Sequence, residues 1–110
     1  MLKPLSIKEA VDGVISLQNL GEFATAVIHP VPNPTDGDEA DVFIGESAES
    51  VGSIELDPEA GGELKIPKKV LEKYSDNRNI PFYYVVYVGG GGNDSPSEKA
   101  FYKIVPAVEK

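Results

Sequence analysis

The sequence predicts an all-β fold, an antiparallel β-sandwich of about seven strands with one short helical turn. Three observations predict it. Short apolar segments rich in β-branched and aromatic residues recur along the chain, separated by clusters of Gly, Pro, Asp and Asn. Residues 80–88 alternate so that both faces are apolar or aromatic, which is typical of a central strand. Pro67 opens a short helical pattern at a position where its missing N–H is not needed.

The N-terminal third contains a lead-in segment and two of the expected strands. Residues 1–11 have the pattern of a lead-in arm or an edge strand, because apolar residues alternate after Pro4. Asp12-Gly13 then signals a turn. Three prolines follow the second strand and end it, since proline cannot donate to a strand ladder. The strands predicted here are 14–17 and 24–29.

The middle of the chain contains three further segments and the helical turn. The segment 51–56 alternates poorly, whereas 57–62 carries a strong turn signal. After Pro67, the apolar residues 70, 71 and 74 form a stripe on one helical face. A helix this short does not stand alone, so we expect it to cover one end of the sandwich. The strands predicted here are 40–45, 51–56 and 63–66.

The C-terminal part contains two expected strands, 80–88 and 98–105, joined by a glycine-rich tip, with residues 106–110 as a tail. Residues 1–110 are expected to form one domain, of ordinary size for a single core. Short strands at this spacing match the criteria for an immunoglobulin-like sandwich, without the disulfide and buried tryptophan of antibody domains. A small open barrel is the structural alternative.

Several motifs follow one another from about residue 10 to 105. They are Ala-Val-Asp-Gly-Val-Ile-Ser-Leu at 10–17, Ala-Val-Ile-His-Pro at 26–30, Gly-Asp followed by an apolar strand at 37–45, Ile-Pro-Lys-Lys-Val-Leu at 66–71, the tyrosine-containing strand 84–88 and Ser-Pro-Ser at 95–97. In this order they resemble bacterial immunoglobulin-like repeat modules of large surface or adhesin proteins from pseudomonads and their relatives. This resemblance implies an exported protein with neighbouring modules, in which the domain acts as a spacer or an adhesive repeat and carries no catalytic residues.

Composition excludes several classes of function. The absence of cysteine excludes disulfides, thiol chemistry and cysteine-ligated metals. The formal net charge of −8 means that the average surface repels nucleic-acid phosphates and anionic membranes, so we expect neither partner. No apolar run approaches the roughly 20 residues of a membrane span. Residues 1–20 also lack the continuous apolar core of a signal peptide.

One candidate metal site lies in the acidic segment 36–41, where four of six residues carry carboxylates. Calcium prefers oxygen ligands of this kind, and Asp36, Asp38 and Asp41 are the candidate ligands. The spacing departs from the EF-hand loop, so a solvated acidic loop is the alternative interpretation. Calcium is the one cofactor that the sequence leaves open.

The candidate partner-binding residues are aromatic and polar. Tyr83 and Tyr87 lie on one face of the 80–88 strand, two positions apart on that face, and Tyr102 could join them to stack on a sugar. Packing within the protein is the alternative role. Asn93 and Asp94 belong to the tip 89–97, which is a candidate contact loop because loops at sandwich ends vary without disturbing the core.

The sequence contains no catalytic constellation. His29 is the one histidine, and no partner for it is signalled. We therefore expect a non-enzymatic module that acts as a spacer or binds a protein, with a carbohydrate- or calcium-binding module as the alternative. The expected location is extracellular or at the cell surface as part of a longer polypeptide, or cytoplasmic if the chain stands alone.

Overall fold

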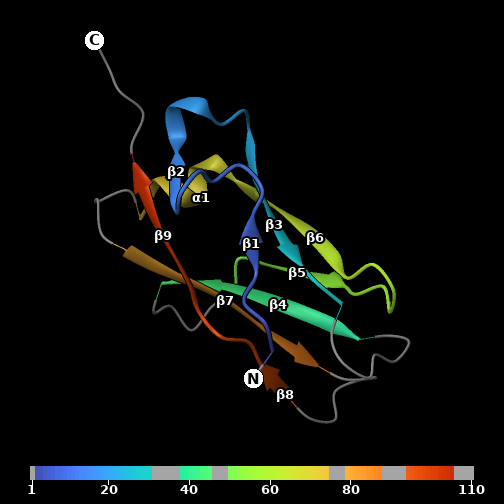
Figure 1. The fold of residues 1–110 in the computed structure, drawn as a ribbon. Coiled ribbons are helices and arrows are strands. Elements are labelled where there is room, and N and C mark those ends of the chain that lie inside the picture. The colour runs from blue at the N-terminus through green and yellow to red at the C-terminus, as the bar shows by residue number, and fades with distance from the viewer. Residues whose placement is uncertain (1, 31–37, 46–49, 75–78, 88–93, 106–110) are drawn as a thin grey trace.

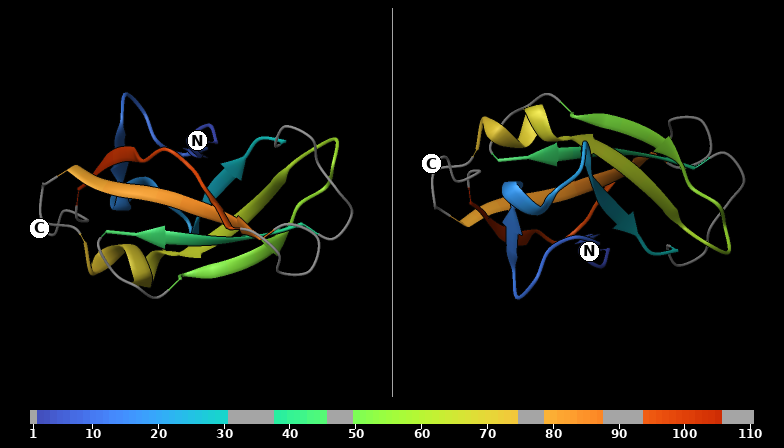
Figure 2. Two further views of the ribbon diagram at one scale, coloured as in Figure 1. Left: turned by 90° about the horizontal axis from the view of Figure 1, so that it is seen from below. Right: turned by 90° about the horizontal axis from the view of Figure 1, so that it is seen from above.

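The computed structural model describes residues 2–30, 38–45, 50–74, 79–87 and 94–105. Over these ranges the chain forms two β-sheets packed as a sandwich, so the predicted all-β fold is confirmed (Figure 1). Figure 2 shows that the strands of the smaller sheet cross those of the larger sheet at an angle. This arrangement is the usual consequence of packing two twisted sheets face to face.

The smaller sheet is antiparallel and has the order β1-β3-β6. The lead-in segment supplies its edge, since Ser6 pairs with Val27 and Ile7 pairs with Ala26. The strands are β1 (Ser6–Ile7), β3 (Phe23–Ile28) and β6 (Gly62–Pro67).

The larger sheet has the order β2-β9-β7-β4-β5, with β8 also paired to β7. The long strand β7 lies at its centre, as the two apolar faces of that segment predict. The strands are β2 (Val14–Ser16), β4 (Glu39–Ile44), β5 (Gly52–Glu55), β7 (Asn79–Tyr87), β8 (Asp94–Pro96) and β9 (Ala100–Val105).

Two pairings differ from the sequence prediction. The strand β2 runs parallel to β9, with Ile15 opposite Ile104, so the sandwich is not wholly antiparallel. The lead-in crosses from the smaller sheet to the edge of the larger one through the Asp12-Gly13 turn, and apolar spacing does not encode strand direction. In addition, β8 forms within the segment predicted to be a hairpin tip, because its backbone continues the ladder of β7.

The core fills the space between the two sheets. Alternation places every second side chain of β3, β4 and β7 in this core. Small side chains from β3 and β4 lie in the same core as the large rings of Phe82 and Tyr84, which lets the layers interdigitate. The fully covered members of these strands are Ala24, Ala26, Ile28, Ala40, Val42, Ile44, Phe82 and Val86.

One end of the sandwich is covered by helical turns. The predicted helix forms as α1 (Lys68–Glu72), directly after Pro67. Its Leu71 is fully buried, and Val70 and Tyr74 pack against the same core. The short helix η1 (Leu17–Asn19) contacts α1 and buries Leu17.

The lead-in segment is fastened to the larger sheet at the other end. Leu2 bridges to Ser97, and the Tyr84 hydroxyl donates a 2.6 Å hydrogen bond to the carbonyl of Lys3. The Ser97 hydroxyl accepts from the backbone N–H of Tyr84 at 3.0 Å and donates to the carbonyl of Glu98 at 2.9 Å. Burial of Tyr84 raises the pKa of its phenol. This network gives the two buried hydroxyl side chains a structural role.

Candidate functional site

The outer face of the larger sheet carries the candidate site. As the alternation predicts, β7 points Phe82, Tyr84 and Val86 into the core and leaves Tyr83 and Tyr87 half-buried on the outer face. Side chains on this face have neighbours from β4 and β9 that are far away in sequence. These neighbours determine which side chains surround Tyr83 and Tyr87 on the surface.

Strand register places further aromatic rings beside Tyr83. Phe43 of β4 lies directly opposite, and the two rings stack with centroids 5.1 Å apart and planes 10° apart. Phe101 of β9 pairs with Pro81 and is 57% exposed. We call the residues Phe43, Pro81, Tyr83, Val85 and Phe101 the aromatic face. A stack and an exposed ring on one sheet surface are features of contact sites rather than of solvated surface.

The Tyr83 ring has contacts toward both neighbouring strands. Phe43 of β4 stacks on the ring, and the ammonium of Lys99, just before β9, lies over it at 5.8 Å from the centroid. A cation above a ring face is a favourable geometry. A flat sugar ring that stacked on Tyr83 would therefore compete with these two contacts.

Tyr102 does not join the other two tyrosines. It lies on the inward side of β9, where its ring meets Phe82 edge to face at 5.4 Å between centroids. Its hydroxyl accepts a 3.1 Å hydrogen bond from the backbone N–H of Ile7. The structure therefore corrects the predicted grouping of Tyr83, Tyr87 and Tyr102, because register turns Phe101 outward in place of its neighbour.

Only part of the predicted contact loop, residues 89–97, lies within the described residues. Asn93 lies outside the described residues. Asp94 lies in β8, where its backbone pairs with Tyr87. His29 is exposed just after the end of β3.

The predicted calcium ligands are not brought together in the described part of the chain. Asp36 lies outside the described residues. Asp38 is buried at 2% exposure, whereas Asp41 points to the outer face of β4 and accepts a 2.5 Å hydrogen bond from the Ser53 hydroxyl. Side chains three positions apart along an extended strand point to opposite sides, which separates these two carboxylates. Among the described residues, no group of three or more His, Asp or Glu side chains is placed to hold a metal ion.

Charges of opposite sign border the aromatic face. On the β9 side the basic side chains are Lys99 and Lys103, both exposed. On the β4–β5 side, Glu39 and Glu55 lie directly opposite one another across the two strands. Like charges in a directly opposed pair destabilise a sheet, so this pair favours a nearby positive charge.

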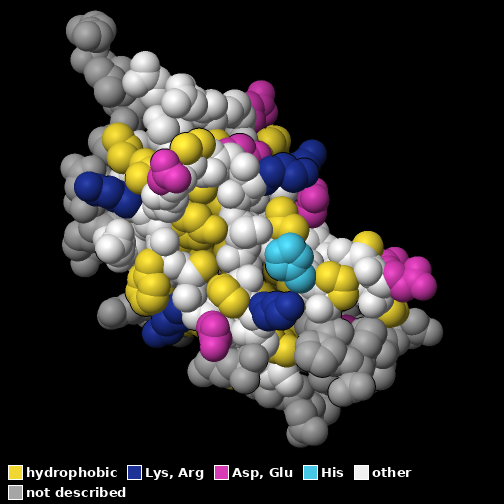
Figure 3. Space-filling view, viewed as in Figure 1, with side chains coloured by type: hydrophobic (Ala, Val, Ile, Leu, Met, Phe, Trp, Pro, Cys, Tyr) yellow, Lys and Arg dark blue, Asp and Glu magenta, His cyan; other side chains and the backbone are white. Residues whose placement is uncertain are grey.

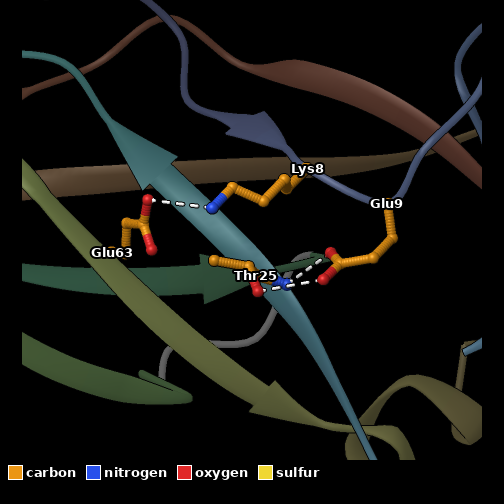
Figure 4. Close-up of polar contacts among 4 residues, drawn as sticks. All are labelled: Lys8, Glu9, Thr25 and Glu63. Atoms are coloured by element: carbon orange, nitrogen blue, oxygen red, sulfur yellow. Dashed lines mark hydrogen bonds and ion pairs between the residues drawn. The ribbon is translucent and has the colours of Figure 1, made fainter. Parts of the chain in front are cut away.

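The outer face of the smaller sheet has a different character. The Glu9 carboxylate accepts hydrogen bonds from the backbone N–H of Thr25 at 2.6 Å and from its hydroxyl at 3.0 Å (Figure 4). Lys8 forms an ion pair with Glu63 at 3.3 Å. The side of the molecule seen in Figure 3, which includes parts of both sheets, intersperses basic, acidic and apolar side chains. On the outer face of the smaller sheet, these polar groups bond to one another, which is typical of ordinary solvated surface.

A concave region lies beside α1. Phe23 at the start of β3 is 42% exposed, and the ammonium of Lys65 lies 5.7 Å from its ring centroid. The region is an open groove lined by Gly21, Glu22, Phe23, Pro67, Lys68, Lys69 and Glu72. It mixes charges of both signs and contains one aromatic side chain, so it selects no ligand class.

Sequence reasoning missed Phe43 and Phe101 as members of the site. The available signal was alternation, since each residue occupies an outward position of its predicted strand. That signal becomes useful only when register shows that these two residues border the Tyr83 strand.

Comparison of the chain with models of known protein families, with curated proteins and with solved structures gives no match. None of the helices in the described part of the chain has the length and apolar content needed to cross a membrane. Topology and the chemistry of the two outer faces are therefore the features of the molecule that bear on its function.

Proposed function

We propose that this chain is a non-catalytic, immunoglobulin-like module of a bacterial surface or secreted protein, which acts as a spacer and contacts protein partners through the aromatic face. The observation that carries the proposal is strand order. The β1-β3-β6 and β9-β7-β4-β5 sheets correspond to strands A, B, E and to strands G, F, C, C′ of immunoglobulin-like sandwiches.

The shape of the molecule supports the spacer role. The sandwich is elongated, with principal extents of 49 × 24 × 21 Å. Leu2 lies beside β8, and β9 runs from there to Val105 at the opposite end (Figure 1). A module whose first and last described residues lie at opposite ends extends a tandem array by nearly its full length.

Ring geometry favours protein over carbohydrate as the partner. Sugar-binding platforms present the free flat face of an aromatic ring, whereas the Tyr83 ring already stacks on Phe43 and lies beneath the Lys99 ammonium. An aromatic stack beside the exposed Phe101 suits the interdigitated side chains of a protein interface. Carbohydrate binding through this face, or calcium binding in the segment 36–41, is the alternative function.

The test is the size and location of the native polypeptide, measured by blotting fractionated source cells with an antibody against this domain. A band much larger than 11.8 kDa in the surface or secreted fraction supports the proposal. A band near 11.8 kDa confined to the cytosol contradicts it. Titration of the domain with oligosaccharides and with calcium, followed by tyrosine fluorescence, tests the alternatives.

A further inference from the structure

The aromatic face is apolar at its centre and oppositely charged at its two sides. Phe43, Pro81, Tyr83 and Val85 occupy the central strands β4 and β7. Lys99 and Lys103 border them at one side, and the other side carries the acidic residues Glu39, Asp41 and Glu55. An apolar centre with a polar rim is the anatomy of a protein interface.

We propose that this face is a homotypic contact, on which a second copy of the same chain packs about a twofold axis. The inference deepens the proposed function and rests on it, because it names the partner of the contact surface. In a twofold interface, residue i of one copy meets residue j of the other, and j meets i. The lysines at one side of each copy then lie over the glutamates at the opposite side of its partner.

The acidic side of the face argues for a partner that supplies lysines. Glu39 and Glu55 are directly opposed across β4 and β5, which is unfavourable in the isolated sheet. Within the described residues, the lysines on this face lie on the far side, beyond the aromatic stack. A second copy turned about the axis brings its own lysines over this pair, so the repulsion within one copy becomes attraction between two.

The aromatic side chains of this face supply apolar contact area, which charged pairs alone do not provide. Phe101 and Phe23 are the two phenylalanines that the described part of the chain leaves exposed, at 57% and 42%. Phe101 borders the stacked rings through its pairing with Pro81, whereas Phe23 lies on the other sheet beneath the Lys65 side chain. Burial of an aromatic anchor near the centre of an interface carries most of its affinity.

The association is expected to be weak for a single module. The net charge of −8 makes two copies repel at long range, although physiological salt screens exposed charges beyond about 8 Å. A weak contact suffices where copies are held near each other, because tethering raises their effective concentration. Homotypic packing of this kind would hold parallel arrays together side by side.

The first arm of the experiment is sedimentation equilibrium of the 110-residue chain over a concentration series, with F101S and the matched control F23S. Both phenylalanines are exposed, so neither substitution removes core packing. We expect dimers at high concentration, a dissociation constant raised about tenfold or more by F101S, and no change with F23S. A monomer at every concentration, or equal effects of the two variants, overturns the inference.

The second arm tests the charge arrangement without assuming which lysine meets which glutamate. The K99E/K103E variant makes both sides of the face acidic. The E39K/E55K variant gives both sides a net positive charge, since two lysines then outweigh Asp41. All four side chains are exposed, so the fold tolerates the exchange. We expect each variant alone to be monomeric and an equal mixture of the two to form heterodimers. Failure of the mixture to associate overturns the inference.

These outcomes are separable from failure of the proposed function. A chain that stays monomeric, while the native polypeptide is large and exposed at the cell surface, overturns homotypic contact and leaves the face to a different protein or a carbohydrate. A small cytosolic polypeptide contradicts the surface role, whatever the result of sedimentation.

Discussion

Replacement of Gly61 by alanine tests the close approach of this turn to the backbone of residues 28–30. Gly61 closes the turn that begins at Asp57, and the two residues exchange backbone hydrogen bonds of 2.8 and 2.9 Å. Its φ is +76°, and a Cβ atom there would lie 2.0 Å from the carbonyl oxygen of Ile28. The neighbouring backbone at His29 and Pro30 would lie only 2.9 and 3.0 Å away, so no flexible side chain can move to make room.

Gly13 is the matched control for this substitution. Its φ is +77°, yet a Cβ atom at that position meets nothing within 4 Å. Both alanine variants incur the cost of a left-handed backbone, about 1–2 kcal/mol. Only G61A also forces the start of the 28–30 segment away from β6, which adds the cost of overpacking, about 1–3 kcal/mol. We therefore expect G13A to lose about 1 kcal/mol and G61A about 3 kcal/mol or more.

The assay is urea denaturation of the three proteins, with the slope of the transition checked for constancy. In thermal unfolding the same difference corresponds to roughly 4 °C or more per kcal/mol. If G61A and G13A lose the same stability, the contact between Gly61 and the carbonyl of Ile28 does not constrain the turn, and the reasoning is refuted.

Three further predictions follow from the core, the lead-in segment and the acidic segment. The Y84F variant loses the hydrogen bond to Lys3 and about 1 kcal/mol at neutral pH. Because burial raises the folded-state pKa of Tyr84 above 10.0, wild-type stability is complete below that pH and declines as pH rises through the folded-state pKa. The difference from Y84F in urea melts at increasing pH should therefore shrink, and a constant difference contradicts the argument. The L71A variant should lose about 2–5 kcal/mol in urea denaturation, since this side chain is fully buried under α1, and a loss below 1 kcal/mol would show that α1 does not seal the core. Added calcium should leave the unfolding temperature unchanged, because Asp38 is buried whereas Asp41 is hydrogen-bonded to Ser53 on the opposite side of the chain. A rise in the unfolding temperature with added calcium contradicts this expectation.

Local patterns predicted most of the elements of the fold. Alternation in 80–88 identified both the centre of the larger sheet and the inward residues Phe82 and Tyr84, because a strand exposes its side chains with a period of two. Pro67 marked the start of α1, and the 57–62 signal marked the turn that begins at Asp57 and ends at Gly61. In each of these segments, one local physical rule determines the conformation.

Other features depend on contacts between distant segments. The parallel pairing of β2 with β9 depends on where the lead-in crosses between sheets, and the spacing of Val14–Ser16 contains no information on direction. Tyr102 was expected on the surface with Tyr83, yet its position in β9 turns it toward Phe82. Asp38 was predicted as a calcium ligand, with a solvated acidic loop as the alternative, but it is buried just before β4.

The candidate site also depends on contacts between distant segments, which a single strand's pattern does not reveal. These contacts explain why the two outer faces differ. Alternation alone marks Tyr83 as outward-facing, but a lone outward tyrosine is ordinary surface. Register adds Phe43 from one neighbouring strand and Phe101 from the other, and it also sets Glu39 against Glu55. On the smaller sheet, by contrast, the polar groups of the lead-in are satisfied within the molecule. The larger sheet thus leaves aromatic side chains and a pair of like charges on its outer face, whereas the smaller sheet satisfies its own polar groups. The unsatisfied interactions are therefore concentrated on one face. A partner gains most by binding there.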